Sequence, residues 1–232
     1  MINLQRLPKQ EILWLSKHKC KAHSHTFLEH PNCVDIEKPS KSLVERVGFL
    51  DIEAEDLKAD YGVLFSYYIK VANENKYYFD YLKTEDFKKY SFKGSGEAKE
   101  DTRLLKSLVN DLQNFDRVIG HYSSRYDLQF IRTRAVICKV DFPEWGTLWQ
   151  TDTWNILKHK FKLSRNSLQN GTLKLTGATN KTYLSLNLKH AMIRGEKWAI
   201  DYLLDHNKKD VIDTERLYNA ISKYARETKS SI

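Results

Sequence analysis

The sequence predicts an α/β domain built on a mixed β-sheet. Three short strand-like runs follow one another from residue 47, strands then alternate with helices, and the last part of the chain is helical. With 41% hydrophobic residues among 232, the chain can bury one sizeable core. We therefore expect one main domain over residues 47–228, preceded by a small N-terminal appendage over residues 1–46.

The first half of the expected domain is rich in strands. The runs 47–54, 62–71 and 76–82 are short, rich in aromatic and β-branched residues, and separated by polar turns. Residues 101–115 then carry leucine and valine at helical spacing. A fourth strand is expected at 117–122, and a helix is expected from Asp127 because helices commonly begin on an acidic residue.

The second half is expected to be mainly helical. Residues 147–154 are predicted as a fifth strand, followed by helices and by a long last helix that extends to about residue 225. On this last helix His206 and Asp210 are four residues apart and therefore share a face. Asp213, three residues further on, competes with Asp210 for a role on that face.

The formal net charge of +8 is concentrated in one window. Residues 155–195 contain eight Lys or Arg and no Asp or Glu, so the other 30 basic residues face 30 acidic ones. A basic stretch of one sign suits a nucleic-acid backbone, and a solvated surface is the alternative. The candidate nucleic-acid-binding residues are Lys158, Lys160, Lys162, Arg165 and Lys174.

The composition also limits the cellular setting that we expect. The longest apolar runs are far shorter than the roughly 20 residues of a membrane helix, and the N-terminus lacks the pattern of a signal peptide. Three cysteines do not form a disulfide framework in a chain of this size. We expect a cytoplasmic (intracellular) protein with no membrane partner.

Acidic residues stand at three places that the predicted fold can bring together. Asp51 and Glu53 lie two apart at the end of the first strand and so share a face. Asp127 follows the fourth strand, where helix capping is the alternative role, and Asp210 lies on the last helix. Carboxylates in this number suit two Mg²⁺ or Mn²⁺ ions, which together can activate water and stabilise the leaving oxygen of a phosphodiester.

Three stretches resemble the motifs of a known superfamily. FLDIEAE, GHYSSRYDLQFIRTRA and HNKKDVIDTERLY are similar, in this order, to the three motifs of the DEDD (DnaQ-like) 3′–5′ exonucleases. The second stretch most resembles the proofreading domains of B-family DNA polymerases and their stand-alone relatives. The resemblance covers about residues 47–225 and implies a ribonuclease-H-like mixed five-stranded sheet flanked by helices. It also implies four metal ligands: Asp51, Glu53, Asp127 and Asp210.

Two positions depart from the pattern that the resemblance implies, and one adds to it. Tyr122 stands where such relatives usually carry Asn, five residues before the Asp of the second motif. Such relatives carry either Tyr four residues before the Asp of the third motif or His five before it, whereas His206 stands four before Asp210, in the position of the tyrosine. We expect His206 to orient or deprotonate the attacking water and count it as catalytic. Asp152 resembles a further acid that these relatives carry near the site.

The predicted appendage contains a cluster of cysteine and histidine. The spacing C-x2-H followed by H-x2-C suits a tetrahedral, structural Zn²⁺ ion, and the alternative is a reduced polar loop without metal. The candidate zinc ligands are Cys20, His23, His30 and Cys33, with His25 as a spare or substitute. The third cysteine, Cys138, is expected to be a small buried hydrophobic residue.

The favoured function is a two-metal-ion 3′–5′ exonuclease that hydrolyses single-stranded nucleic acid, with DNA favoured over RNA. Aromatic residues near the motifs are candidates for stacking on bases, and at least half of them are expected to belong to the core instead: Tyr122, Tyr126, Trp145, Trp149 and Trp154. Any role in replication or repair would need a protein partner. Two alternatives remain, a structure-specific endonuclease of the same fold and a non-catalytic nucleic-acid-binding module. The presence of all four acids argues against the second alternative.

Overall fold

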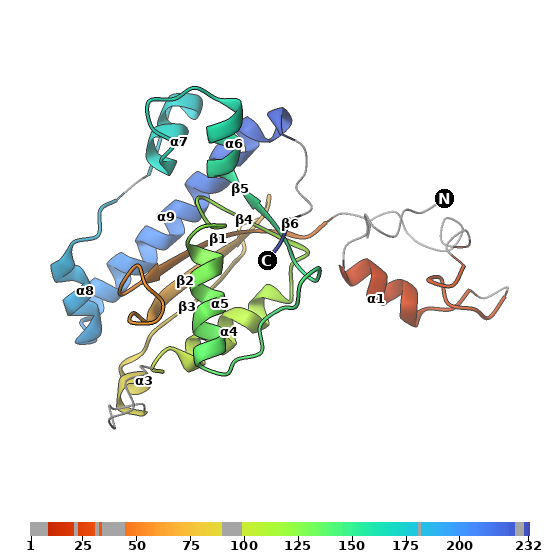
Figure 1. Cartoon of the computed structure of the whole chain (residues 1–232), viewed down its shortest axis with the longest axis horizontal. Helices are drawn as coiled ribbons and strands as arrows, with labels where there is room; N and C mark the ends of the chain where they lie inside the picture. Colours follow the sequence, from red (N-terminus) through yellow and green to blue (C-terminus); the bar gives the residue numbers. More distant parts are fainter. Residues whose placement is uncertain are drawn as a thin grey trace.

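The structure, a computed structural model, describes residues 9–20, 23–30, 33, 45–89, 99–180, 182–225 and 230–232. Its centre is a mixed sheet of strands in the order β3-β2-β1-β4-β5-β6 (Figure 1). The strands are β1 (Val47–Ala54), β2 (Leu64–Val71), β3 (Tyr77–Tyr81), β4 (Arg117–Gly120), β5 (Trp149–Asp152) and β6 (Ser230–Ser231). β1 pairs antiparallel with β2 and parallel with β4, so the central strand joins a hairpin half to a parallel half.

Helices cover both faces of the sheet. Along the chain, α1 (Lys9–Lys17) belongs to the N-terminal segment, and α3 (Thr84–Lys89), α4 (Thr102–Leu112) and α5 (Asp127–Ile137) come next. They are followed by α6 (Thr153–Lys160), α7 (Leu168–Thr176), α8 (Leu186–Ile193), α9 (Lys197–Ile221) and the 3₁₀ turn η4 (Ser222–Tyr224). The long helix α9 packs across β1, β2 and β4, whereas α4 packs on β2, β3 and α5 (Figure 1).

Side-chain alternation along β1 decides which residues face α9. Phe49 packs with Ile119 of β4 and Val211 of α9, while Leu50 and Ile52 belong to the main core on the other face. Successive side chains of a strand point to opposite faces. The positions two and four after Phe49, which are Asp51 and Glu53, therefore continue along the face that α9 covers.

The predicted fold class is confirmed, with one correction to the sheet. It has six strands rather than five, because residues 230–231 form β6 beside β5. There Ser231 donates to the carbonyl of Leu148 at 3.0 Å, and Ile232 is 3% exposed. A strand of two residues has no periodicity from which a sequence pattern could predict it. The short helices α1 and α3 were also not expected.

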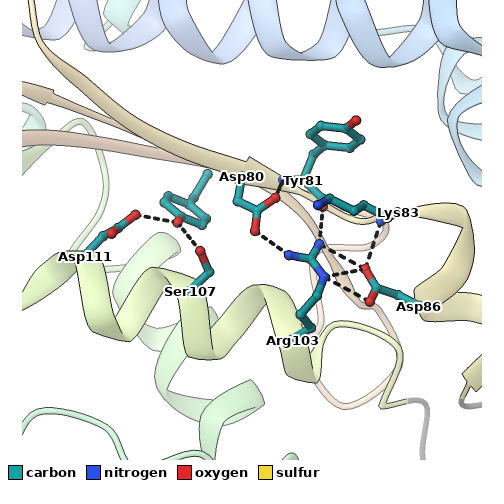
Figure 2. A network of polar contacts seen from close by, with 8 residues as sticks. Asp80, Tyr81, Lys83, Asp86, Arg103, Ser107 and Asp111 are labelled. Atoms are coloured by element: carbon teal, nitrogen blue, oxygen red, sulfur yellow. Dashed lines mark hydrogen bonds and ion pairs between the residues drawn. The ribbon is translucent and has the colours of Figure 1, made fainter.

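A polar network holds the outer hairpin to α4 (Figure 2). The guanidinium of Arg103 in α4 binds both carboxylate oxygens of Asp86 at 3.0 Å, and it also binds Asp80 and the carbonyl of Tyr81. Asp86 in turn accepts the backbone N–H of Lys83 at 2.9 Å. One arginine therefore ties β3 and α3 to the helix beneath the sheet.

A buried ion pair anchors α5, the helix that begins at Asp127. Arg134 and Asp101 have side chains 1% and 0% exposed, and the guanidinium binds both carboxylate oxygens at 2.7 and 2.9 Å. Asp101 also accepts the backbone N–H of Leu64 at 2.9 Å, at the start of β2. Cys138, buried as predicted, lies beside this pair with Sγ 3.4 Å from Asp101.

The described part of the N-terminal segment has a small apolar cluster of its own. Leu15, Phe27 and the two cysteines Cys20 and Cys33 are buried in it, and Trp14 packs against them. Among the described residues, no helix combines the length and the apolar character needed to cross a membrane.

Candidate active site

Three elements bring the four expected acids to one end of the sheet. Asp51 and Glu53 lie half-buried on β1, and Asp210 comes from α9 above them. Asp127 is buried at the first position of α5, just after β4. Its Oδ1 accepts the backbone N–H of Ile52 at 3.2 Å, the residue between Asp51 and Glu53. That hydrogen bond fixes the Asp127 carboxylate beside the other acids.

The acids raise one another's pKa. Burial, followed by the charges of Asp210, Asp127 and Glu53, raises the pKa of Asp51 well above its usual value. Burial raises the pKa of Asp127 to about 7; backbone hydrogen bonds act in the opposite direction, and the charges of Glu53 and Asp152 add to the increase. Because the ionised forms of these carboxylates are unfavourable, a bound cation would stabilise them strongly.

The spacing of the acids is open rather than cage-like. Among the described residues, a Cys/His group has its ligand atoms all within 4.8 Å of one another, and no set of three acids does so. Mg²⁺ is commonly held by only one or two carboxylates and keeps several waters. The carboxylate oxygens of β1, α5 and α9 are the hard donors that such an ion prefers, so the site fits it.

His206 lies between two of the acids. Its Nε2 is 3.2 Å from Oε1 of Glu53 and 3.5 Å from Oδ2 of Asp210, and its Nδ1 is 2.6 Å from Oγ1 of Thr182. Ionised carboxylates accept but do not donate, so the tautomer that satisfies both of these contacts carries its proton on Nε2. The histidine therefore bridges β1 and α9 as a hydrogen-bond donor. As the structure stands, Nε2 is not available as a base.

Asn207 is a site residue that sequence reasoning missed. It is fully buried, donates from Nδ2 to Oδ2 of Asp51 at 2.6 Å, and contacts Ser66 of β2 through Oδ1. Its hydrogen bond opposes the rise in the Asp51 pKa. The sequence did contain an indication of this role. Asn207 lies on the same buried face of α9 as Leu203 and Val211, and a buried amide is unfavourable unless it has a hydrogen-bond partner.

Asp213, the competing acid of α9, has a different set of partners. It is fully buried and accepts hydrogen bonds from the Thr179 hydroxyl at 2.7 Å and from the backbone N–H of Asn180 at 2.7 Å. Arg216 binds its other oxygen at 2.9 Å. These partners engage both oxygens, so Asp213 fastens the segment after α7 to α9.

Asp152 positions the loop between β4 and α5. It ends β5 and caps α6, where it accepts the N–H of Trp154 at 2.9 Å. It also accepts the N–H of Tyr122 at 2.8 Å and the hydroxyl of Ser124 at 2.6 Å. Tyr122 has a φ of +64°, which is uncommon for a residue other than glycine, and these bonds stabilise that conformation. Asp152 thus holds the Tyr122 backbone in place.

A cavity of about 400 Å³ opens beside the acids, within the size range of ligand pockets. Its lining consists of Asp51, His121, Tyr122, Trp154, Asn166, Ser167, Leu168 and Asp210. The lining therefore combines two of the acids with the aromatic rings of Tyr122 and Trp154. The rings of Tyr122 and Trp154 are 5.1 Å apart between centroids and nearly perpendicular.

Two basic residues lie against Trp154, one of the aromatic residues that line this cavity. The Nζ of Lys158 and the guanidinium of Arg125 each lie 4.9 Å from the Trp154 ring. All five of the predicted nucleic-acid-binding residues are exposed, on or between α6 and α7: Lys158, Lys160, Lys162, Arg165 and Lys174. Lys189, from the same basic window, instead binds the carbonyl of Ala54 at 2.8 Å and stabilises the end of β1.

The N-terminal segment contains a Cys₂His₂ cluster that could bind a metal such as zinc. The ligand atoms of Cys20, His23, His25 and Cys33 all lie within 4.8 Å of one another. His25, expected as the spare, is therefore in this group in place of His30. The Nδ1 of His30 lies 3.2 Å from the Sγ of Cys33.

Comparison with known proteins adds a likeness in fold. No protein-family model matches the chain, and no curated protein matches its sequence. Among solved structures it is similar to the family B DNA polymerase from the hyperthermophilic archaeon Pyrobaculum calidifontis, with a TM-score of 0.56 and 13% identity. The match covers 78% of this chain and 25% of the polymerase, so the chain spans about a quarter of that protein. At this identity the likeness shows a shared fold.

Proposed function

We propose that the protein is a metal-dependent nuclease that removes nucleotides from the 3′ end of single-stranded DNA. The observation that carries this proposal is the cluster of Asp51, Glu53, Asp127 and Asp210, in which burial, followed by the charges of neighbouring acids, raises the pKa of Asp51 and Asp127. Such a cluster is suited to two Mg²⁺ or Mn²⁺ ions. The motif resemblance and the fold shared with a family B DNA polymerase support the same reading.

Each residue of the site would have a distinct role. Asp51, Glu53, Asp127 and Asp210 would hold the ions, which when bound supply an activated water and charge neutralisation at the leaving oxygen. Asn207 positions the Asp51 carboxylate through its 2.6 Å hydrogen bond. His206 would hold the Glu53 and Asp210 carboxylates in position through hydrogen bonds donated by Nε2–H, a role in orientation rather than the base role that the sequence also allowed.

The cavity beside the acids would receive the 3′ end of the single-stranded DNA. Tyr122 and Trp154 offer aromatic surface on which a base can stack, and base stacking is tolerant of sequence. The exposed lysines of α6 and the following loop would contact phosphates. The experiment that tests the proposal is release of nucleotides from a single-stranded DNA oligonucleotide with Mn²⁺, which should be lost in Asp127→Asn.

Substitutions at His206 should separate a positioning role from a surface role. We expect His206→Ala to lower the cleavage rate about 10²-fold, because Glu53 and Asp210 lose their shared donor. His206→Tyr should stay within roughly tenfold of the wild type, since a phenol can also donate. The control is Asp205→Asn, an exposed neighbour paired with Lys209. Equal rates for all the variants would remove His206 from the site.

The basic surface should control binding through its phosphate contacts. Replacing Lys158, Lys160 and Lys162 by Ala should weaken binding of single-stranded DNA and reduce the slope of log K against log salt by up to about 2. Fluorescence anisotropy over a salt series measures this slope. A matched triple variant replaces other exposed lysines and should keep the wild-type slope: Lys76, Lys83 and Lys106. An unchanged slope in the first variant would place the substrate elsewhere.

A further inference from the structure

We propose that the N-terminal segment binds one structural Zn²⁺ ion through Cys20, Cys33, His23 and His25, and that His30 supports the site from outside the coordination sphere. This site shares no residue with the proposed nuclease centre. The proposal therefore stands or falls independently of the catalytic one.

A tight hairpin carries three of the four ligands. Lys19 and Thr26 form an antiparallel bridge, and within it the N–H of Cys20 donates to the carbonyl of His25 at 2.9 Å. Ser24, at the tip, has a φ of +61° and donates its N–H to the carbonyl of Cys20 at 2.9 Å. The reversal brings residues on both sides of the tip to one place.

A second turn brings the fourth ligand to the hairpin. The carboxylate of Glu29 accepts both the N–H of Thr26 at 2.7 Å and its hydroxyl at 2.8 Å, and the N–H of Glu29 donates back to that hydroxyl at 3.3 Å. This reciprocal pattern is a capping box, which begins a helical turn. The N–H of His30 follows with a bond to the Thr26 carbonyl, and Cys33 then donates its N–H to the His30 carbonyl.

The distances between ligand atoms match those of a tetrahedral zinc site. Zn–S distances of about 2.3 Å and Zn–N distances of about 2.0–2.1 Å place sulfur and nitrogen roughly 3.5–3.6 Å apart in a tetrahedron. Nδ1 of His23 lies 3.5 Å from Sγ of Cys20 and 3.6 Å from Sγ of Cys33. Both cysteines are buried, and neither forms a disulfide bond.

Two observations select His25 rather than His30 as the fourth ligand. Nε2 of His25 is buried and has no hydrogen-bond partner among the described residues, although a buried ring nitrogen normally has one. Nδ1 of His30 already has a partner, because it lies 3.2 Å from Sγ of Cys33, closer than two ligands of one tetrahedron. That distance suits an N–H···S hydrogen bond to a thiolate, a common support for a metal ligand.

The rest of the segment explains why it needs a metal. Among its described residues, the buried apolar side chains besides the two cysteines are Leu15 and Phe27, with Trp14 and Leu28 partly buried against them. Units of this size commonly depend on a metal or disulfides, because they bury too little apolar surface to fold alone. Four protein ligands leave no open position, so the ion would be structural.

Cobalt substitution of the full-length chain tests the assignment. Metal-free protein titrated with Co²⁺ should show thiolate-to-cobalt charge transfer and tetrahedral d–d absorption that reach a plateau at one equivalent, and added Zn²⁺ should bleach both. The control Cys138→Ser should behave as the wild type, since its thiol lies beside Asp101 in the main core. A wild-type titration without charge transfer would overturn the proposal without recourse to any variant.

Two histidine variants then decide between the ligands. His25→Ala should lose the tetrahedral spectrum or weaken zinc binding by more than 100-fold, because only three protein ligands remain. His30→Ala should keep the spectrum and the stoichiometry, with affinity reduced about 10- to 100-fold, as expected for a residue that supports a ligand. The reverse result, with His30→Ala losing the spectrum and His25→Ala keeping it, would overturn the assignment of His25.

Discussion

Asp127→Asn should abolish Mn²⁺-dependent cleavage while leaving the protein folded. Losing a metal-ligating carboxylate removes several kcal/mol of transition-state stabilisation, which corresponds to a rate at least about 10³-fold lower. The side chain keeps its shape, and the amide oxygen of Asn can still accept the N–H of Ile52. The cleavage rate, compared with the wild type at equal protein concentration, measures the effect.

The same substitution should make the metal-free protein less sensitive to pH. The pKa of Asp127 is raised to about 7 in the folded state, so between about pH 4 and pH 7 the folded chain binds a proton that the unfolded chain has lost. Stability should therefore fall as pH rises through this window, and part of that fall should be absent in Asp127→Asn. Urea unfolding at pH 5 and pH 8 in the presence of a chelator checks the sign.

An exposed acid on another element provides the control for both measurements. Asp201 of α9 forms a surface pair with Lys197, and Asp201→Asn should change neither the cleavage rate nor the pH dependence of stability. If Asp127→Asn cleaves as fast as the wild type, Asp127 does not belong to the site. A variant that loses both activity and stability at pH 8 would indicate a structural role instead.

Arg134→Met should cause a large loss of stability. The change leaves the Asp101 carboxylate buried without its cation, and breaking a buried pair in this way lowers the free energy of unfolding by about 3–5 kcal/mol. The guanidinium also donates to the carbonyl of Ala59 at 3.1 Å, so the β1–β2 connection loses a contact as well. Urea denaturation at pH 7 measures the free energy of unfolding.

Arg132→Met is the matched control on the same helix. Arg132 is exposed, so its replacement should change the free energy of unfolding by no more than about 0.5 kcal/mol. Equal effects of the two substitutions would show that the ion pair does not anchor α5. Because α5 begins at Asp127, a loosened helix should also reduce cleavage below the unfolding transition.

Local patterns predicted the frame of the fold well. The alternation along β1 put Asp51 and Glu53 on one face, and in the structure Phe49 shows that this is the α9 face. Spacing along the last helix likewise put His206 and Asp210 on one side, and Nε2 of His206 is 3.5 Å from Asp210. Patterns within one element suffice here because the relevant period is fixed by the backbone itself.

Relations between distant elements were not predictable in the same way. Asn207 contacts Asp51 and Ser66, which lie more than 140 positions away, and nothing in its local sequence indicates either partner. The role of Asp152 likewise depends on a distant segment, because its carboxylate accepts the backbone N–H of Tyr122 in the β4–α5 loop. The choice between His25 and His30 depends on distances that the spacing of ligands leaves open. Distances between side chains, rather than a pattern along the sequence, decide these three cases.

The most direct test of the nuclease proposal is a gel time course with internally labelled oligonucleotides. Single-stranded DNA and RNA with a blocked 3′ or a blocked 5′ end are incubated with Mg²⁺ or Mn²⁺ and with the wild type or Asp127→Asn. The proposal predicts mononucleotides released from DNA with a free 3′ end, no release when that end is blocked, and no release by the variant. Internal cuts would indicate an endonuclease, and binding without any cleavage by the wild type would contradict the proposed catalytic function.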